Sequence, residues 1–566
     1  MARRSPGSAG AVRVDEDDEG AGPARAAQAA AAAPEGADAA HVFVVHGDLS
    51  LLACDDVLVP TDAQGRVTRG FAPLLGDALR AGPGGRGHVA AEALEAGGDG
   101  LERLRGDGER GTWLVDTASG DVQRLAAQVE RFVRAAAARP GGPRHGRAKR
   151  LLAMPLVGTG EGGAAGRRGD VIGGLLPLLH RLCAELDVDA ALVLADPRDH
   201  AAAQEVRRRE GRWPLPRGLL DRADELARLA TAGRLALFVG AGVSRAAGLP
   251  VWQELLDRLA VRAGLGDGER EALAALAPPD AAQLLEGRLG PQGLADELRS
   301  LYDRTEHALS HALLAALPVR QVVTTNFDPL LEVAFAGAGR ALRLLPGDAP
   351  AQGPGEPWLL KVHGDVRRPG DVVLTREGFL RLPEERAALA GVVPSLLLAQ
   401  HVLFVGFSLL DDTFIRAAHQ VRRLREEHGG PPVGTALALR EEPLRQELWA
   451  QDLTQVSLGG ATTPLPAAAR RLEVLLDRVA ASSTPRSGWL LDDRYAALRS
   501  PQDAALAGAL ARLRRELPEE ATGSPAWEEV RALLEDGLGG CPPGRRGGAG
   551  AGAGTAATAV TQRDDR

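Results

Sequence analysis

Four apolar runs in the middle of this 566-residue chain each end in a short motif of small and polar residues. In an open parallel sheet, ligands bind beyond the carboxyl ends of the strands, so motifs placed there converge on one crevice. The pattern therefore predicts an α/β domain with a ligand site at one edge of a parallel sheet. The runs and their motifs are residues 235–239 before 240–244, 322–323 before 324–328, 358–360 before 361–364, and 402–405 before 406–408.

The first motif is a glycine-rich turn between a buried strand and a helix that we expect to start near Leu249. Gly240, Ala241 and Gly242, followed by Ser244, would let the backbone approach a pyrophosphate group closely. The helix that follows offers unpaired N–H groups and a positive dipole end, which suit an anion. A turn that needs glycine for steric reasons alone would look the same, so the motif by itself leaves both interpretations open.

The second motif places two polar residues after its strand and before an amphipathic stretch at 329–336. Asn326 can donate and accept hydrogen bonds at once, which suits ribose hydroxyls or a carboxamide, and Asp328 can accept from an amide N–H. Asp328 is also well suited to cap the helix that follows. Capping and ligand binding are compatible, and the pairing with Asn326 favours a binding role.

The third motif contains the candidate catalytic residue. His363 follows the strand at 358–362 and precedes Gly364, and an imidazole at a strand end can take a proton from a hydroxyl at neutral pH. We therefore predict His363 to be a general base. Lys361 and Lys149 are the two lysines of the chain, so Lys361 has either a special role beside His363 or a position due to chance.

The ligand groups expected at the first two motifs, a pyrophosphate, ribose hydroxyls and a carboxamide, occur together in a dinucleotide, and the fourth motif is expected to bind another part of such a ligand. Gly406 and Ser408 would bring backbone and hydroxyl groups to the adenosine half. Asp411 or Asp412 is expected to cap the helix beginning near Thr413, which is a structural role.

Composition excludes several classes of protein. The net charge is −8 and no arginine-rich run is interleaved with aromatic residues, so we expect no nucleic-acid partner. The three cysteines lie far apart, which argues against a disulfide framework or a zinc ribbon and favours the cytoplasm. The start lacks the pattern of a secretory signal, and the longest apolar stretch, at 389–410, is broken by polar residues, so we expect no membrane association.

The chain is predicted to contain two α/β domains with helical and flexible ends. Alternating apolar runs and helical patterns indicate a three-layer α/β domain at 41–208, and a second α/β domain runs over 219–480 with a helical insertion at 260–317. A helical region follows at 486–538. Residues 1–40 and 539–566 are expected to be disordered because they carry few large apolar side chains. In the first domain, strands are expected at 41–45, 56–59, 112–115, 151–156 and 190–194, with helices at 122–138 and 171–186.

Taken in order, the segments GAGVSRAAGLPVW, TTNFD, KVHG and VLFVGFSLLDD resemble the sirtuin family, specifically the bacterial sirtuin-like domains of antiphage defence proteins. The resemblance spans about residues 234–421 and implies a Rossmann-like, NAD-binding core with a catalytic His363. It implies that Asn326 and Asp328 surround the nicotinamide ribose and the nicotinamide. The other residues that it implies at the dinucleotide are Gly240, Ala241, Gly242, Ser244, Gly406 and Ser408.

The sequence departs from the protein-deacylating sirtuins because the second domain contains no cysteine, so the zinc-binding quartet of that family is absent. The resemblance therefore favours NAD hydrolysis to nicotinamide and ADP-ribose, restrained until a signal arrives, without zinc. Two alternatives stay open: a non-catalytic sensor of NAD or an ADP-ribose-type nucleotide, and a protein deacylase or ADP-ribosyltransferase. The sequence also leaves a homo-oligomer open.

The first domain resembles a macro domain less sharply. Residues 47–50 and 55–62 are similar to the opening strand and adenine-side segment of that family, and residues 155–163 to its phosphate loop. This resemblance implies Asp48 at an adenine and Gly158, Gly160 and Gly162 around a diphosphate, with an ADP-ribose-type nucleotide as activator. The family's Asn is missing from 55–62, which argues against ADP-ribosyl hydrolysis. Alternatively, Asp48 only caps a turn and the glycine loop is a flexible connection.

Overall fold

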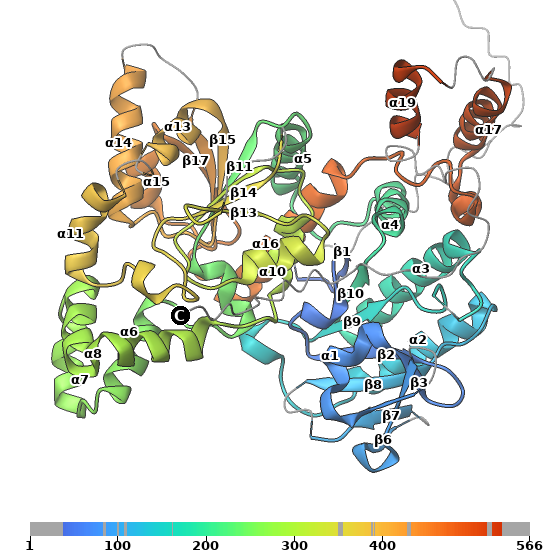
Figure 1. Cartoon of the computed structure of the whole chain (residues 1–566), viewed down its shortest axis with the longest axis horizontal. Helices are drawn as coiled ribbons and strands as arrows, with labels where there is room; N and C mark the ends of the chain where they lie inside the picture. The colour runs from blue at the N-terminus through green and yellow to red at the C-terminus, as the bar shows by residue number, and fades with distance from the viewer. Residues whose placement is uncertain are drawn as a thin grey trace, which may run out of the picture.

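The computed structural model describes residues 38–82, 86–98, 101–106, 110–160, 162–348, 355–386, 389, 391–426, 432–517 and 523–534. The two segments predicted to be disordered, residues 1–40 and 539–566, lie outside the described residues except for 38–40. Figure 1 shows two sheets, one in the blue to cyan part of the chain and one in the green to orange part, with helices around and between them.

The first sheet is mixed, and its parallel strands are the five predicted from the apolar runs. Parallel pairing joins the first five strands in spatial order, and the last two strands pair antiparallel. In that order the strands are β1 (Val42–His46), β10 (Asp189–Leu194), β9 (Leu151–Pro155), β2 (Asp56–Thr61), β8 (Gly111–Asp116), β7 (Leu101–Leu104) and β6 (Leu94–Gly98).

Five short strands of this domain were missed by the sequence analysis. Besides β6 and β7, a small antiparallel sheet is formed by β3 (Arg66–Thr68), β5 (Arg86–Val89) and β4 (Leu79–Ala81). Segments of three to five residues, each interrupted by glycine or arginine, are too short to show the alternation on which strand prediction depends.

One face of the first sheet is covered by helices that bury the residues pointing to that side. The predicted helices are present as α2 (Val122–Ala137) and α3 (Arg168–Leu186), and α4 (Pro197–Glu210) packs beside them. Because side chains alternate along a strand, Val42 and Val44 face this layer while Phe43 and Val45 face the other side.

The second sheet has seven strands, and all the pairs between them are parallel in the part of the chain that the structure describes. It holds the four motif strands at its centre, so their carboxyl ends share one edge. In spatial order the strands are β13 (Arg343–Leu345), β14 (Trp358–Lys361), β12 (Gln321–Thr324), β11 (Leu235–Val239), β15 (His401–Val405), β16 (Gly434–Ala438) and β17 (Leu453–Ser457).

One continuous apolar core joins the two sheets. Phe43 and Val45 of β1 belong to the same buried cluster as Leu237 of β11, and helices between the sheets supply the rest. Figure 1 shows α10 and α16 in this middle layer. The two domains therefore bury apolar surface jointly. The middle helices are α5 (Arg217–Thr231), α9 (Leu309–Ala315), α10 (Leu330–Gly337) and α16 (Leu465–Ser483).

A buried charge network fixes the two domains to each other. Asp477 of α16 accepts from the two terminal nitrogens of the Arg207 guanidinium at 2.9 and 2.5 Å and lies 2.8 Å from Nε2 of His41. All three residues are at most 2% exposed, and such groups are stable only when paired, so the arrangement fixes how α16 meets the first sheet. Burial lowers the pKa of His41 to about 4, against the opposing effect of Asp477.

Residues 260–317 contain helices and no named strand. The helices α6 (Trp252–Arg262), α7 (Asp267–Ala274) and α8 (Pro278–Tyr302) form their own apolar cluster, drawn in green in Figure 1. On the face of the second sheet away from the middle layer lie α13 (Val392–Ala399), α14 (Asp412–Glu426) and α15 (Pro443–Trp449). The sequence predicted α14 as a helix at 413–425.

The helical region after the second domain contains α17 (Pro501–Glu516) and α19 (Pro525–Ala532), which Figure 1 shows close together. No helix among the described residues is both long and apolar enough to cross a bilayer.

Candidate active site

A cavity of about 970 Å³ lies at the carboxyl edge of the second sheet, where the four motifs meet. Of the nine residues predicted for this site, eight line the cavity, and the ninth, Gly240, directly precedes the lining residue Ala241. The eight lining residues are Ala241, Gly242, Ser244, Asn326, Asp328, His363, Gly406 and Ser408. The motifs therefore converge on one space, and the imidazole of His363 and the amide of Asn326 lie on the same side of the sheet.

The glycine turn packs tightly against the loop after β15. The Gly240 N–H donates to the Val405 carbonyl and the Gly242 N–H to the Gly406 carbonyl, both at 3.0 Å. A Cβ on Gly240 would lie 2.5 Å from the Gly406 carbonyl oxygen, and Gly406 itself has a φ of +62°. The steric interpretation of these glycines is therefore correct, and it brings two cavity-lining loops together without excluding a ligand.

The helix expected near Leu249 begins three residues later than predicted. The turn continues into a 3₁₀-helix, η7 (Ala241–Ala247), which ends at Gly248 in a left-handed conformation, and α6 starts at Trp252. The groups next to the cavity therefore belong to η7, and the first turn of α6 supplies Trp252 to the cavity wall.

Ser244 is the centre of a buried hydrogen-bond network that joins three elements. Its hydroxyl donates to Asp328 Oδ2 at 2.9 Å and accepts from Asn326 Nδ2 at 3.2 Å. Nε2 of His311, on α9, lies 3.3 Å from the same oxygen. A hydroxyl has one proton and two lone pairs, so these three partners saturate it. The sequence did not indicate His311 as a site residue, because it lies in the helical insertion, away from every motif.

Asn326 has an unused acceptor in this arrangement. Its Nδ2 group donates to the Ser244 hydroxyl. Its Oδ1 is buried and has no hydrogen-bond partner among the described residues, and Asn326 as a whole is only 6% exposed. A buried polar atom of this kind costs free energy unless a ligand, water or rearrangement satisfies it. The amide oxygen is therefore ready to accept a hydrogen bond from a ligand.

Asp328 both caps a helix and belongs to the network. Its Oδ1 accepts from the Leu330 N–H at 3.1 Å, so the capping expectation is met at the start of α10. Burial raises the pKa of Asp328, against the opposing effects of the Lys361 charge, the Leu330 N–H and the Ser244 hydroxyl.

Lys361 braces the loop that carries Asn326 and Asp328. Its ammonium group donates to the carbonyls of Phe327 and Asp328 at 3.2 and 2.8 Å and to Glu332 Oε1 at 2.7 Å. With a 4% exposed side chain and every donor used, Lys361 has a structural role; whether it also has a role beside His363 stays a prediction.

His363 lies at the end of β14, 4% exposed, with its ring packed edge-on against Phe379 of α11 (Arg376–Glu385) at 5.1 Å between centroids. Its Nε2 lies 3.2 Å from Asp411 Oδ2, close enough for an ion pair but outside aligned hydrogen-bond geometry. Gly364 is required here because it has a φ of +89° and a Cβ would lie 2.0 Å from the Asp371 carbonyl oxygen.

The candidate ligand residues of the first domain are arranged differently. Asp48 accepts from the backbone N–H and the hydroxyl of Ser50, both at 2.8 Å, so the turn-capping alternative is what the structure contains. Gly158 has a φ of +73° and faces Leu125, and a Cβ on Gly162 would lie 2.8 Å from the Gly158 Cα, whereas Gly160 has open space around it. The glycine loop is thus closely packed at Gly158 and Gly162 but open at Gly160.

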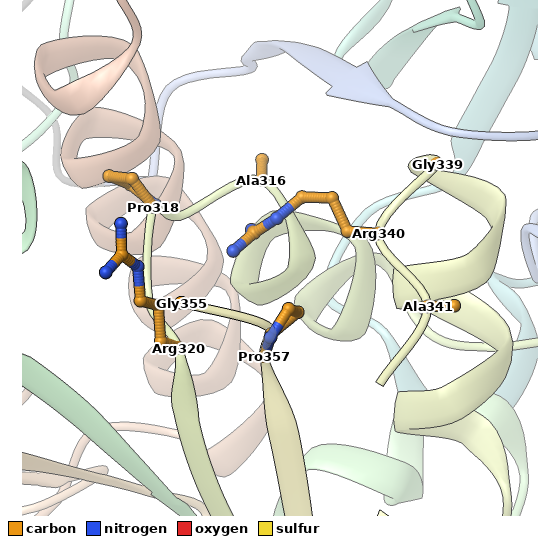
Figure 2. A pocket seen from close by; sticks show the side chains of 8 residues that line it. All are labelled: Ala316, Pro318, Arg320, Gly339, Arg340, Ala341, Gly355 and Pro357. Atoms are coloured by element: carbon orange, nitrogen blue, oxygen red, sulfur yellow. The ribbon is translucent and has the colours of Figure 1, made fainter. Parts of the chain in front are cut away.

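A second hollow, of about 520 Å³, lies at the opposite edge of the second sheet, where β12 and β14 begin. Figure 2 shows Arg340 extending across it from the end of α10. The Arg340 guanidinium donates to the carbonyls of Ala315, Leu317 and Val319, which lie at and beyond the end of α9. Its charge therefore satisfies the end of a helix, and this hollow does not contain the predicted chemistry.

The described residues include two cysteines, and neither belongs to a group suited to a metal ion. No group of three or more His, Cys, Asp or Glu residues suited to a metal ion occurs in the residues that the structure describes. Cys54 and Cys183 are buried thiols in the first domain, and burial raises the pKa of each.

Comparison with known families identifies part of the chain. A family model described as a SIR2-like domain matches residues 320–456, which include the last three of the four motifs. This part of the second domain is similar to SIR2-like domains. The resemblance to sirtuins is confirmed for this range, whereas the resemblance of the first domain to macro domains stays a prediction.

Similar curated proteins include three bacterial relatives. "NAD(+) hydrolase ThsA" of Bacillus cereus (strain MSX-D12) is 29% identical over 34% of this chain and 40% of its own length. "NAD(+) hydrolase ThsA" of Enterococcus faecium is 27% identical over 35% and 42%, and "Defense-associated sirtuin 2" of Bacillus subtilis is 24% identical over 38% and 22%. The chain therefore spans less than half the length of these relatives.

Proposed function

We propose that the SIR2-like domain hydrolyses NAD to nicotinamide and ADP-ribose. The observation that carries this proposal is the meeting of His363, Asn326 and Asp328 in one cavity at the carboxyl edge of a parallel sheet. A volume of about 970 Å³ suits a ligand of this size. The names of the ThsA relatives support the same chemistry, since they are called NAD(+) hydrolases.

Breaking the bond between nicotinamide and ribose develops positive charge on the sugar, as in glycoside cleavage. In the proposed mechanism, His363 takes a proton from the attacking water or from a ribose hydroxyl, and nicotinamide leaves as a neutral molecule. Water adds to the ribose carbon and one proton is released to solvent. The amide oxygen of Asn326 accepts from the carboxamide or from a ribose hydroxyl, because it is an unused acceptor in the cavity wall.

The test is NAD consumption by the purified full chain, with nicotinamide and ADP-ribose followed by chromatography. We expect His363→Ala and Asn326→Ala to lower turnover at least ~100-fold, the range typical of losing a general base or an oriented polar contact. His419→Ala is the matched control, because His419 is exposed on α14. Retained turnover in both variants would refute the assignment. NAD binding without turnover in the wild type would favour a non-catalytic sensor.

We also propose that the activity serves antiphage defence and is gated through the first domain. The name of the Bacillus subtilis relative, "Defense-associated sirtuin 2", supports the biological role. Bacteria that express the wild type should lose fewer cells to phage infection than bacteria that express His363→Ala. Equal protection by both would contradict a defence role that depends on NAD hydrolysis.

The proposed gating ligand is an ADP-ribose-type nucleotide at the carboxyl edge of the first sheet. This proposal is supported by topology: Asp48 follows β1 and the glycine loop follows β9, two parallel strands separated only by β10. Backbone N–H groups in a glycine loop can hold a diphosphate. A ligand that prefers one arrangement of this edge would shift the population of states of the neighbouring cavity.

Calorimetry on the full-length His363→Ala variant tests this proposal, because the shared core makes an isolated first domain a poor substitute. With NAD in excess to fill the second cavity, ADP-ribose should still release heat, and the further change Asp48→Ala should remove it. Asp77→Ala, which alters an exposed carboxylate of the same domain, is the control. Heat that survives Asp48→Ala, or no heat with ADP-ribose or its cyclic relatives, would contradict the site.

A further inference from the structure

Asp411 lies where two structural demands meet. It follows β15 in the loop that leads into α14, and its Oδ1 accepts from the Phe414 N–H at 3.0 Å, which is the capping role that the sequence predicts. Its other oxygen, Oδ2, lies 3.2 Å from Nε2 of His363, which comes from a strand three positions away in the sheet. Capping alone needs only one of these oxygens.

The surroundings make this pair more than a surface contact. The side chains of Asp411 and His363 are 12% and 5% exposed, and both line the cavity. Leu409, two residues before Asp411, is buried with a φ of +59°, a left-handed conformation that is costly for leucine. The loop is therefore held in a strained shape that directs a carboxylate at the candidate base.

The surroundings of Asp411 favour the ionised form of its carboxyl group. Burial alone would raise the pKa of Asp411, but His363 and the N–H groups of Phe414 and Thr413 outweigh burial and hold the pKa below its usual range. A carboxylate beside one nitrogen of a neutral imidazole favours the tautomer with its proton on that nitrogen. Asp411 would thus keep the proton of His363 on Nε2 and leave the lone pair on Nδ1.

We propose that Asp411 is a positioning residue for the reaction, which selects the His363 tautomer and stabilises the imidazolium that forms when His363 takes a proton. The inference rests on the proposed NAD hydrolase function. In the reaction, one proton moves from water to Nδ1 of His363, the water oxygen bonds to the ribose carbon, and neutral nicotinamide leaves. The positive charge on His363 is then next to the carboxylate of Asp411 until the proton passes to solvent.

Asp411→Asn is the informative variant, because asparagine keeps the size and the capping oxygen but removes the charge. A carboxylate this close favours the imidazolium over the neutral ring by about 10–100-fold, so we expect kcat for NAD hydrolysis to fall by about this factor. The KM for NAD and the melting temperature should change little, since substrate contacts and the helix cap are retained. Asp257→Asn is the matched control, because Asp257 is an exposed carboxylate on α6 that does not belong to the cavity lining.

A second measurement does not depend on activity. In protein labelled with ¹⁵N-histidine, the signals of His363, assigned by comparison with His363→Ala, should report the Nε2-protonated tautomer in the wild type and a mixture in Asp411→Asn. If the wild type shows this tautomer but hydrolyses no NAD under any condition, the proposed function fails while the pairing stands. Unchanged kcat in Asp411→Asn, an equal loss in Asp257→Asn, or the Nδ1-protonated tautomer in the wild type would each overturn the inference.

Discussion

The carboxyl edges of the two sheets carry similar sequence signals but differ in how their polar groups are used. At the second edge, side chains from separate strand connections bond to one another, as Ser244 does with Asn326 and Asp328. At the first edge, Asp48 bonds within its own turn, to Ser50. Glycines close a tight turn at both edges. A polar network shared among strands, rather than a glycine turn, therefore distinguishes the candidate active site.

The two edges are also connected. The His307 N–H donates to the Leu51 carbonyl at 2.8 Å and the Ala53 N–H to the His307 carbonyl at 2.9 Å, so the segment after Asp48 is paired with the residue just before α9. The same helix carries His311, which reaches Ser244 at 3.3 Å. Buried hydrogen bonds thus run from the first edge to the second, which gives the gating proposal a physical route.

The largest expected effect comes from breaking the brace of the second edge. Lys361→Met would leave the partly buried Glu332 without its cation and would remove a donor from the Asp328 carbonyl, whereas the Phe327 carbonyl would keep the Val366 N–H. Removal of one partner from a buried ion pair costs about 3–5 kcal/mol, so we expect the free energy of unfolding, measured with urea, to fall by about this amount. NAD turnover should fall with it, because the loop that carries Asn326 loses its support.

Lys149→Met is the control for this prediction. Its partner Asp187 is 77% exposed at the side chain, so the pair should contribute at most about 1 kcal/mol. Similar losses in the two lysine variants would mean that the Lys361 network contributes no more than a surface pair, and the contrast between the two edges would then lose its energetic basis.

The sequence predicted the parts of this molecule that depend on local patterns. The four motif strands and helices such as α2, α3 and α14 follow from apolar runs and periodicity, and eight predicted site residues line one cavity because parallel strands bring their carboxyl ends together. That these residues bind or cleave NAD stays a prediction until the variants are measured.

The sequence could not predict the partners that support the site, because they depend on tertiary packing. The sequence around Asp411 indicates a helix cap and nothing more. Its contact with His363 forms because the loops after β15 and β14 meet at the carboxyl edge, although these two strands are not neighbours in the sheet. His311 lies in a helix without a motif, and its role depends on where α9 packs against η7. Lys361 stood out in the sequence because lysine is rare in this chain. That rarity does not indicate its partners, which include the Asp328 carbonyl in the loop after β12.

The smallest expected effect tests the bridge between the edges through its dependence on pH. Burial lowers the pKa of His307 to about 4, whereas the pKa of an unfolded histidine is about 6.5. Between these values the unfolded chain binds a proton at this position and the folded protein does not. The contribution of His307 to stability is therefore complete above pH ~6.5 and is lost as the pH falls toward 4, by at most about 1.4 kcal/mol per pH unit.

His307→Gln removes this titration but keeps a side-chain donor for the Ala308 carbonyl, which Nδ1 of His307 meets at 3.2 Å. Urea unfolding between pH 5 and 6.5 should then show a slope of stability against pH that is smaller than that of the wild type by up to about 1.4 kcal/mol per unit. His419→Gln, at an exposed position, should leave the slope unchanged. If His307→Gln also leaves the slope of stability against pH unchanged, the His307 imidazole binds its proton equally well in the folded and the unfolded protein. The pairing of His307 with Leu51 and Ala53 would then be open to water, and the two edges would not be joined by a buried route.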